Sequence, residues 1–215
     1  MNKKTRTSQS KILNYPKDTD CVEKSARIIQ KGGLIVFPTK GLYGIGADIF
    51  NFEAVSKIYE IKQRPLSKPV LMFIKDISEA EIYCKNIPEQ AELLMKKFWP
   101  GDITFILEAS EKTPEILTGN TGKIGVRVPA HPFAADLLKK MKTPLTGTSA
   151  NISGKDASGD PDKIDQEIIE KTDLFINAGY TGEEKPSTII EAGQEEIKIL
   201  RSGRISEKEI KNYLF

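Results

Sequence analysis

The sequence predicts an α/β protein with an open mixed sheet and flanking helices. Short apolar runs such as "LIVFP" and "PVLMFIK" alternate along the whole chain with longer segments of helical periodicity. Near the C-terminus two apolar runs follow one another without a helix between them, which favours some antiparallel pairing. No internal repeat or low-complexity linker interrupts this pattern, so we expect one domain.

Helices are predicted where apolar residues recur every three or four positions between end signals. In the segment 19–31, Val22, Ala26 and Ile29 share one face, and two glycines end the pattern. Further helices are expected over a segment that contains Val55, Ile58 and Ile61 and ends before Pro65, near 78–85, over 88–98, over 132–141, over 161–171 and after Ser206.

Strands are predicted at the short apolar runs between these helices. They cover 34–38, 69–75, 103–109, 123–129, 144–150, 173–179, 187–192 and 197–203. We expect loops over 37–48, 110–122 and 151–160, where glycine and small polar residues gather.

The composition is typical of a soluble globular protein and not of a disordered or membrane protein. Hydrophobic residues make up 39% of the chain and charged residues 29%. No apolar run approaches the roughly 18 residues that span a bilayer, and no apolar signal-peptide core follows the basic N-terminus. We therefore expect a cytoplasmic protein without membrane contact.

Positive charge is concentrated at the N-terminus. Residues 1–17 hold five basic side chains and no acidic one, which leaves 27 basic and 30 acidic residues, a charge of −3, in the rest of the chain. We interpret 1–17 as a solvated basic arm and 18–215 as the folded domain. A duplex-binding surface normally gives its domain a basic excess, so any nucleic acid must bind in one concentrated groove.

Metal-ligating and thiol side chains are few. Cys21 and Cys84 form no CxxC pair, so reduced, partly buried thiols are expected in place of a disulfide or zinc site. We expect His131, the one histidine, to begin a helix or to pack and not to catalyse. No protein metal site is predicted.

The glycine-rich segment "FPTKGLYGIGAD" follows a predicted strand. Gly41, Gly44 and Gly46 would let backbone N–H groups approach a ligand, because glycine lacks a Cβ and tolerates positive φ. Its GxxGxG spacing matches neither a dinucleotide-binding fingerprint nor a Walker loop. Anion binding and a tight structural turn therefore both stay open.

A cationic cluster lies in "IKQRPLSKP". Lys62, Arg64 and Lys68 fall within seven residues without an acid between them. The helix dipole alone would favour cations at a helix C-terminus by roughly 0.3–1 kcal/mol. Three cations are better explained by a triphosphate, whose charge several Lys and Arg contacts offset.

Hydroxyl and amide side chains gather at the end of a predicted strand in "TGTSANISG". Ser149 and Asn151 would suit a simple loop turn, but open α/β sheets bind ligands at strand ends, which favours a ligand site. Ser187 and Arg201 form a further polar pair on two late strands.

An ordered set of segments resembles the YrdC-like family from about residue 19 to 205: "PTKGLYGIGA", "KQRPLSKP", "FWPGDITFIL", "GVRVPAHP", "TGTSAN", "STII" and "ILRSG". Each motif alone is unspecific, whereas the ordered set is specific. The characterised members of this family are threonylcarbamoyl-AMP synthases. The resemblance implies the single-domain form, with a twisted sheet around a basic concave cavity.

The resemblance also implies a reaction. L-threonine, bicarbonate and ATP would give threonylcarbamoyl-AMP and pyrophosphate, the first step towards threonylcarbamoyladenosine in tRNA, with Mg²⁺ arriving on ATP. The substrate-binding residues would be Thr39, Tyr43, Arg127 and Ser187. The ATP-binding residues would be Lys62, Arg64, Lys68, Thr118, Ser149, Asn151 and Arg201. A downstream threonylcarbamoyltransferase is an implied partner, tRNA or double-stranded RNA is a further candidate partner, and no catalytic residue is assigned.

The glycine-rich segment departs from the family pattern. The family commonly has "PTET" or "PTDT" where this chain has "PTKG", so Lys40 replaces a carboxylate and Gly41 a threonine. If the family geometry persists, the substitution Lys40→Glu should preserve or raise activity. Two other functions stay open: a non-catalytic YrdC-like module that binds RNA or nucleotide, and an enzyme that handles another carbamoyl-adenylate.

Overall fold

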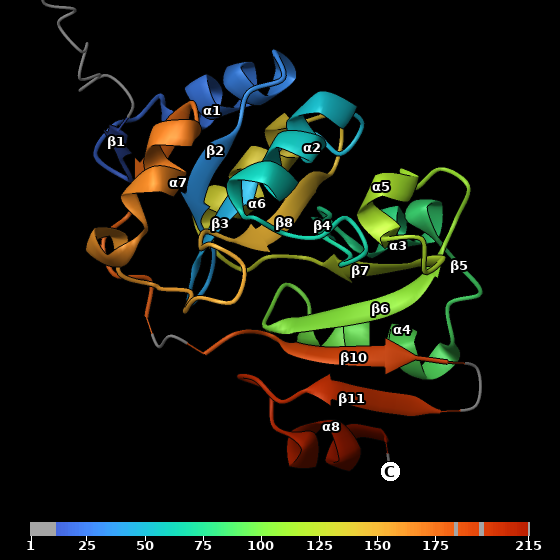
Figure 1. Cartoon of the computed structure of the whole chain (residues 1–215). Helices are drawn as coiled ribbons and strands as arrows, with labels where there is room; N and C mark the ends of the chain where they lie inside the picture. The colour runs from blue at the N-terminus through green and yellow to red at the C-terminus, as the bar shows by residue number, and fades with distance from the viewer. Residues whose placement is uncertain (1–11, 183–184, 194–195, 215) are drawn as a thin grey trace, which may run out of the picture.

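The computed structural model describes residues 12–182, 185–193 and 196–214. Their strands form one open mixed sheet in the order β1-β9-β2-β3-β8-β4-β7-β6-β10-β11, with β5 paired to β6 outside this path (Figure 1). The predicted fold class is therefore confirmed. The strands are β1 (Ile12–Asn14), β2 (Ile35–Pro38), β3 (Tyr43–Gly46), β4 (Leu71–Phe73), β5 (Cys84–Lys85), β6 (Ile103–Ala109), β7 (Lys123–Arg127), β8 (Leu145–Ser149), β9 (Leu174–Asn177), β10 (Thr188–Ala192) and β11 (Ile197–Arg201).

The helices lie on both sides of the sheet (Figure 1). They are α1 (Cys21–Gln30), α2 (Phe52–Ile61), α3 (Ile77–Tyr83), α4 (Glu89–Phe98), α5 (Glu115–Thr118), α6 (Pro132–Lys140), the 3₁₀ helix η2 (Pro161–Lys163), α7 (Gln166–Lys171) and α8 (Glu207–Leu214). None of the helices in the described part of the chain is both long and apolar enough to cross a membrane.

Strand β8 joins two halves of the sheet, because it pairs antiparallel with β3 on one side and with β4 on the other. In the half that contains β1, β9, β2 and β3, helices α1 and α6 pack on one face and α2 and α7 on the other. In the half that contains β4, β7, β6 and β10, helices α3, α4 and α8 share one apolar core with one face. The opposite face of this second half lines a cavity.

Side-chain alternation along β6 and β7 separates the core from that open face. Ile103, Phe105 and Leu107 of β6 are buried in the core, whereas Thr104 and Ile106 line a cavity. Successive residues of a strand point to opposite faces, so one strand serves both purposes. Arg127 of β7 reaches the cavity by the same alternation.

Two segments that were predicted to be loops contain regular structure. Tyr43–Gly46 form β3, which is antiparallel to both β2 and β8. A Cβ on Gly46 would lie 2.7 Å from the Phe37 ring, so glycine is needed there because β2 packs closely and not because the segment is irregular. Tertiary pairing overrides the loop-like composition. The segment 110–122 likewise contains the short helix α5.

The folded domain begins before residue 18, the boundary that the sequence predicts. β1 pairs parallel with β9, with Ile12 opposite Phe175, so residues 12–14 are an edge strand and not part of a solvated arm. Three residues are too few to show a strand pattern in the sequence. Four of the five basic residues of the predicted arm lie outside the described residues: Lys3, Lys4, Arg6 and Lys11.

Candidate functional site

A cavity of about 650 Å³ lies against the second half of the sheet. Its floor is formed by β4, β6, β7, β8 and β10, and its walls by the 39–44, 149–157 and 186–187 segments. Eight of the eleven predicted site residues line it: Thr39, Tyr43, Arg64, Arg127, Ser149, Asn151, Ser187 and Arg201. The fold thus gathers residues that are far apart in sequence.

Arg127 is the cation of the cavity floor. Its side chain is buried, Nε donates to the Gly101 carbonyl oxygen at 2.7 Å, and Nη2 donates to Asp102 Oδ1 at 2.6 Å. The guanidinium carbon lies 6.0 Å from the Phe73 ring centroid. Nη1 has no protein partner among the described residues and stays available to an anion. Burial lowers the pKa of Arg127 to about 10, so the group is still cationic at neutral pH.

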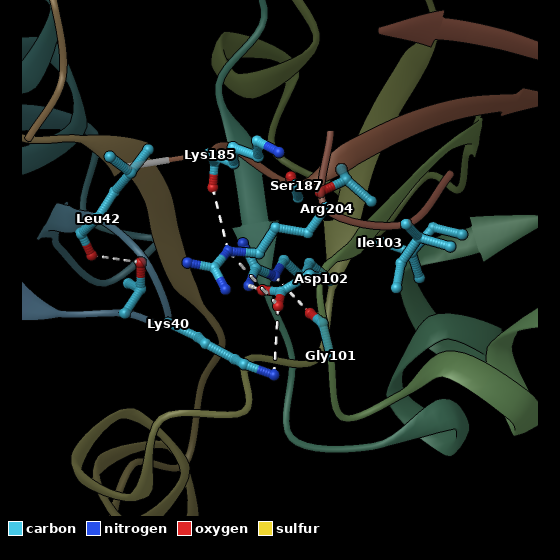
Figure 2. Close-up of polar contacts among 12 residues, drawn as sticks. Lys40, Leu42, Gly101, Asp102, Ile103, Lys185, Ser187 and Arg204 are labelled. Carbon is cyan, nitrogen blue, oxygen red and sulfur yellow. Dashed lines mark hydrogen bonds and ion pairs between the residues drawn. The ribbon is translucent and has the colours of Figure 1, made fainter. Parts of the chain in front are cut away.

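Asp102 is a buried carboxylate behind Arg127. Its Oδ2 lies 3.3 Å from Lys40 Nζ and 3.9 Å from Arg204 Nε, while Oδ1 accepts the bond from Arg127. Figure 2 shows Lys40 and Arg204 reaching Asp102 from different segments of the chain. Sequence reasoning did not select this residue, although "FWPGD" does place an acid directly before an apolar strand.

Lys40 therefore has a partner inside the fold. A glutamate at position 40 would bring a second carboxylate to Asp102, and like charges at this distance repel. The expectation that Lys40→Glu preserves activity stays a prediction, and this ion pair argues against it.

Lys62 is not among the residues that line the cavity, and its contact with phosphates stays a prediction. Its side chain is buried, and Nζ donates to the carbonyl oxygens of Ser149 and Asn151 and to Asn151 Oδ1. Burial, together with the charge of Arg64, lowers the pKa of Lys62 to about 7. The Lys62 side chain therefore anchors the 149–151 turn through these hydrogen bonds.

In the 149–151 turn, both the oxygen and the nitrogen of the Asn151 side-chain amide form hydrogen bonds within the protein. Ser149 Oγ donates to Asn151 Oδ1 at 2.5 Å, and Asn151 Nδ2 donates to the carbonyl oxygens of Ile152 at 3.0 Å and Lys155 at 2.6 Å. Asn151 therefore fixes the path of the following loop, which brings Lys155 and Asp156 to the cavity.

Arg64, Lys68 and Thr118 lie in three different environments: the cavity, the surface and the buried interior. Arg64 lines the cavity, and its Nη2 donates to the Pro69 carbonyl oxygen at 2.7 Å. Lys68 is exposed and is not among the cavity-lining residues. Thr118 is buried outside the cavity, where its hydroxyl donates to the Glu115 carbonyl oxygen at 2.8 Å. The three cations thus do not converge on one point.

Thr39 closes the loop of residues 39–42 at one wall of the cavity. Its backbone N–H and its hydroxyl both donate to the Leu42 carbonyl oxygen, at 2.9 and 2.7 Å. Tyr43 follows, and its hydroxyl donates to the Gly179 carbonyl oxygen at 2.7 Å while it accepts from the Ala178 N–H at 2.9 Å. These bonds fix the wall before any ligand binds.

Ser187 and Arg201 form another part of the cavity wall and are hydrogen-bonded to each other. Arg201 Nη2 donates to the Ser187 carbonyl oxygen at 2.8 Å, and the hydroxyls of Ser187 and Thr104 are 2.9 Å apart. The predicted proximity of these two late residues is therefore present in the fold.

The residues that we excluded from catalysis lie elsewhere. His131 begins α6, where its Nδ1 accepts from the Phe133 N–H at 3.2 Å, as predicted. Cys21 and Cys84 are buried and free, again as predicted. In the part of the chain that the structure describes, no group of three or more His, Cys, Asp or Glu side chains could hold a metal ion.

Comparisons with known proteins agree with this fold and cavity. Residues 27–203 match the model of the Sua5/YciO/YrdC family, which is described as telomere recombination. The threonylcarbamoyl-AMP synthase of Pyrococcus abyssi is 35% identical over 190 residues, which cover 88% of this chain and 56% of that protein. The chain therefore spans just over half the length of this relative.

Two further similarities extend the comparison. The crystal structure of P. abyssi Sua5 complexed with L-threonine matches with a TM-score of 0.89 at 33% identity, and covers 94% of this chain and 59% of that chain. The protein YciO of Escherichia coli K12, which is named uncharacterized, is 33% identical over 184 residues, 85% of this chain and 88% of that protein. With a family model that matches most of its length, this chain belongs to the Sua5/YciO/YrdC family.

Proposed function

We propose that this protein is an L-threonylcarbamoyladenylate synthase, a nucleotidyltransferase that converts L-threonine, bicarbonate and ATP into threonylcarbamoyl-AMP and pyrophosphate. The observation that carries the proposal is the single cavity that eight predicted site residues line. The name of the Pyrococcus relative and the threonine in the Sua5 structure support it.

In this proposal the amino acid binds at the floor of the cavity. Arg127 offers its Nη1 to the threonine carboxylate, since its other nitrogens are held by Gly101 and Asp102. The hydroxyls of Thr39 and Ser187 line the adjacent walls and supply further polar contacts. The buried guanidinium strengthens the interaction because little water competes for it.

ATP binds across the rest of the cavity. Arg64 and Arg201 neutralise phosphate charge from opposite walls, and Ser149 and Asn151 contact the nucleotide from the turn between them. Asp156 is the one carboxylate among the described lining residues, and Asp102 is already paired with cations. Mg²⁺ would therefore arrive with the ATP phosphates and their water and not in a protein cage.

The chemistry needs alignment and charge neutralisation more than a basic side chain. Threonine amine and bicarbonate give a carbamate and one molecule of water. A carbamate oxygen then forms a bond to the α-phosphorus of ATP as the bond from that phosphorus to pyrophosphate breaks. Holding carbamate and phosphate in line supplies the effective concentration for this step. Arg64 and Arg201 would stabilise the charge that moves onto the leaving pyrophosphate.

The test is pyrophosphate release by the purified chain with MgATP and bicarbonate, with and without L-threonine. Threonine-dependent release, with a product of the mass of threonylcarbamoyl-AMP, is expected, and Arg127→Gln should raise KM for threonine. ATP binding without threonine-dependent release would overturn the proposal. Transfer to tRNA requires a downstream threonylcarbamoyltransferase, and direct tRNA binding would appear as salt-sensitive affinity.

Lys40 supports a second candidate, an enzyme that makes another carbamoyl-adenylate. Lys40 carries a positive charge at the wall next to Thr39, where the family pattern has a carboxylate. Replacing threonine by other amino acids in the same assay separates the two candidates. Pyrophosphate release that is faster with another amine would favour the second.

A further inference from the structure

We propose that Asp102 is a positioning residue of the cavity, and that its ion pair with Lys40 holds the loop of residues 39–42 in place relative to Arg127. One carboxylate would then set the positions of the 39–42 wall and of Arg127 at the floor of the amino-acid subsite together. The kinetic part of this inference rests on the proposed function, whereas its structural part does not.

The two oxygens of Asp102 serve different parts of the chain. Oδ1 accepts from Arg127 on β7 at 2.6 Å, and Oδ2 faces Lys40 from the 39–42 loop at 3.3 Å. The Asp102 side chain is 5% exposed, while that of Lys40 is 50% exposed. The fixed partner is therefore the carboxylate, and the lysine reaches inward to it (Figure 2).

The backbone around Asp102 is anchored on both sides. The Asp102 carbonyl oxygen accepts from the Thr188 N–H at 2.9 Å, and the Gly101 N–H donates to the Val128 carbonyl oxygen at 3.0 Å. Because Arg127 also donates to Gly101, residues 101–102 tie β7 to the start of β10. Because its backbone is held in this way, the Asp102 carboxylate has a fixed position to which a loop can be bound.

The loop connects the paired ends of β2 and β3, at Pro38 and Tyr43, and has few other ties to the rest of the fold. The bonds from Thr39 to Leu42 are internal to it, and the Gly41 N–H donates to the Thr181 carbonyl oxygen at 3.3 Å. Thr39 and Leu42 both line the cavity. Releasing Lys40 would therefore remove the side-chain tie between the tip of this hairpin and Asp102, while the pairing of Pro38 with Tyr43 still holds its two ends.

Hydrogen exchange tests the structural part without any assay of activity. In Lys40→Met and in Asp102→Asn, the amides of residues 39–42 should exchange several-fold faster than in the unchanged protein. The double variant should exchange no faster than Asp102→Asn alone, because the Lys40–Asp102 pair is already absent from that variant, which also loses the charge beside Arg127 and Arg204. Unchanged exchange in Lys40→Met, or additive effects in the double variant, would overturn the proposal.

Lys75→Met is the matched control. Lys75 pairs with Glu79 at 2.9 Å, and their side chains are 45% and 9% exposed. Like the Lys40–Asp102 pair, this pair therefore joins a half-exposed lysine to a buried carboxylate. This pair is not part of the cavity. Its removal should leave exchange at 39–42 and the kinetics unchanged. A change equal to that in Lys40→Met would mean that losing any such pair loosens the loop.

Kinetics test the coupling to the amino-acid subsite. Lys40→Met should raise KM for L-threonine about tenfold, as expected for a displaced charged contact, with a smaller change in kcat. Lys40→Glu should raise the KM for L-threonine further, whereas Lys40→Arg, which keeps the positive charge, should leave it close to that of the unchanged protein. If Lys40→Met alters exchange but not KM in an active enzyme, Asp102 does not position the subsite. If the unchanged protein shows no threonine-dependent activity, the proposed function fails, while the exchange result still decides whether the ion pair holds the loop.

Discussion

Lys62 and Arg64 show how two cations of one motif come to serve different ends. They are two residues apart after α2, yet Lys62 Nζ points to the 149–151 turn and Arg64 lines the cavity. The backbone direction at the end of a helix decides this, and Gln63 between them has a positive φ of 50°. A sequence motif gives the charges but not their directions.

We expect these two residues to respond differently to truncation. Arg64→Met should weaken ATP binding by about 1.5–3 kcal/mol, the range for a lost charged contact, with little change in stability. Lys62→Met should lower the free energy of unfolding by about 1–3 kcal/mol, because it leaves buried carbonyl oxygens without a donor. Titration calorimetry with ATP and urea unfolding measure the two effects.

The exposed Lys68 provides the control for this comparison, since Lys68→Met removes the same charge without a buried bond. If Lys62→Met proves as stable as the unchanged protein but loses ATP affinity, Lys62 contacts the phosphates after all, as the sequence alone predicts.

The lowered pKa of Lys62 also predicts a pH dependence. The folded protein releases this proton near pH 7, whereas an unfolded lysine holds it until about pH 10.4. Between these values the unfolded chain binds more protons, so stability should rise with pH. The difference in unfolding free energy between the unchanged protein and Lys62→Met should widen from pH 6.5 to 9.5. A constant difference would show that the ammonium group titrates normally.

Most of the site could be predicted at the residue level, because polar motifs that follow strands in a known order identify the residue types. The sequence could not show that Lys62 and Thr118 turn away from the cavity, since their burial depends on the tertiary fold. Asp102 was missed for the same reason: a single acid acquires its meaning from Lys40 and Arg127, which approach it from distant segments.

At the level of elements, β10 and β11 must lie close together to hold the Ser187–Arg201 wall. Gly203 follows β11, and a Cβ there would lie 2.4 Å from both the Pro186 carbonyl oxygen and the Thr188 nitrogen. These are backbone atoms, so the two segments would have to separate.

Gly203→Ala should therefore lower stability by about 1–3 kcal/mol, as overpacking commonly does, and reduce ATP affinity by displacing Arg201. Thermal unfolding and ATP titration measure this. Gly193→Ala, at the turn between the same strands, meets its nearest atom at 3.4 Å and should change neither. Equal effects in both variants would rule out the close approach as the cause.

The accuracy of the sequence-based prediction differs between elements. Long periodic segments such as α1 and α4 were predicted to within a few residues, because their apolar faces are regular. β3 was not, because a strand with two glycines has few side chains to show a period of two. Its pairing with β2 and β8 is visible only in three dimensions.

For the whole molecule, the position of the cavity beside β8 means that a ligand bound there would contact both halves of the sheet. Thr39 and Tyr43 belong to one half, and Arg127 and Ser187 to the other. A ligand held between them stabilises the folded state by mass action, by about 2.7 kcal/mol at a concentration of 100 times Kd.

Saturating MgATP and threonine should therefore raise the melting temperature as one cooperative transition and slow amide exchange in both halves. Calorimetry and hydrogen exchange measure this, with Arg64→Met as the variant in which ATP should have less effect. Protection confined to one half would show that the ligand does not bridge them.

The order of strands has a consequence for how the protein is made. β1 and β2 both pair with β9, although β9 follows β1 by most of the length of the chain. During synthesis the N-terminal strand therefore has no partner until the ribosome has added roughly 160 more residues, about 8–30 s at 5–20 residues per second. β1 is therefore translated long before its partner, and the edge of β2 that pairs with β9 stays unpaired in the nascent chain until β9 has been made, a surface for chaperones to cover.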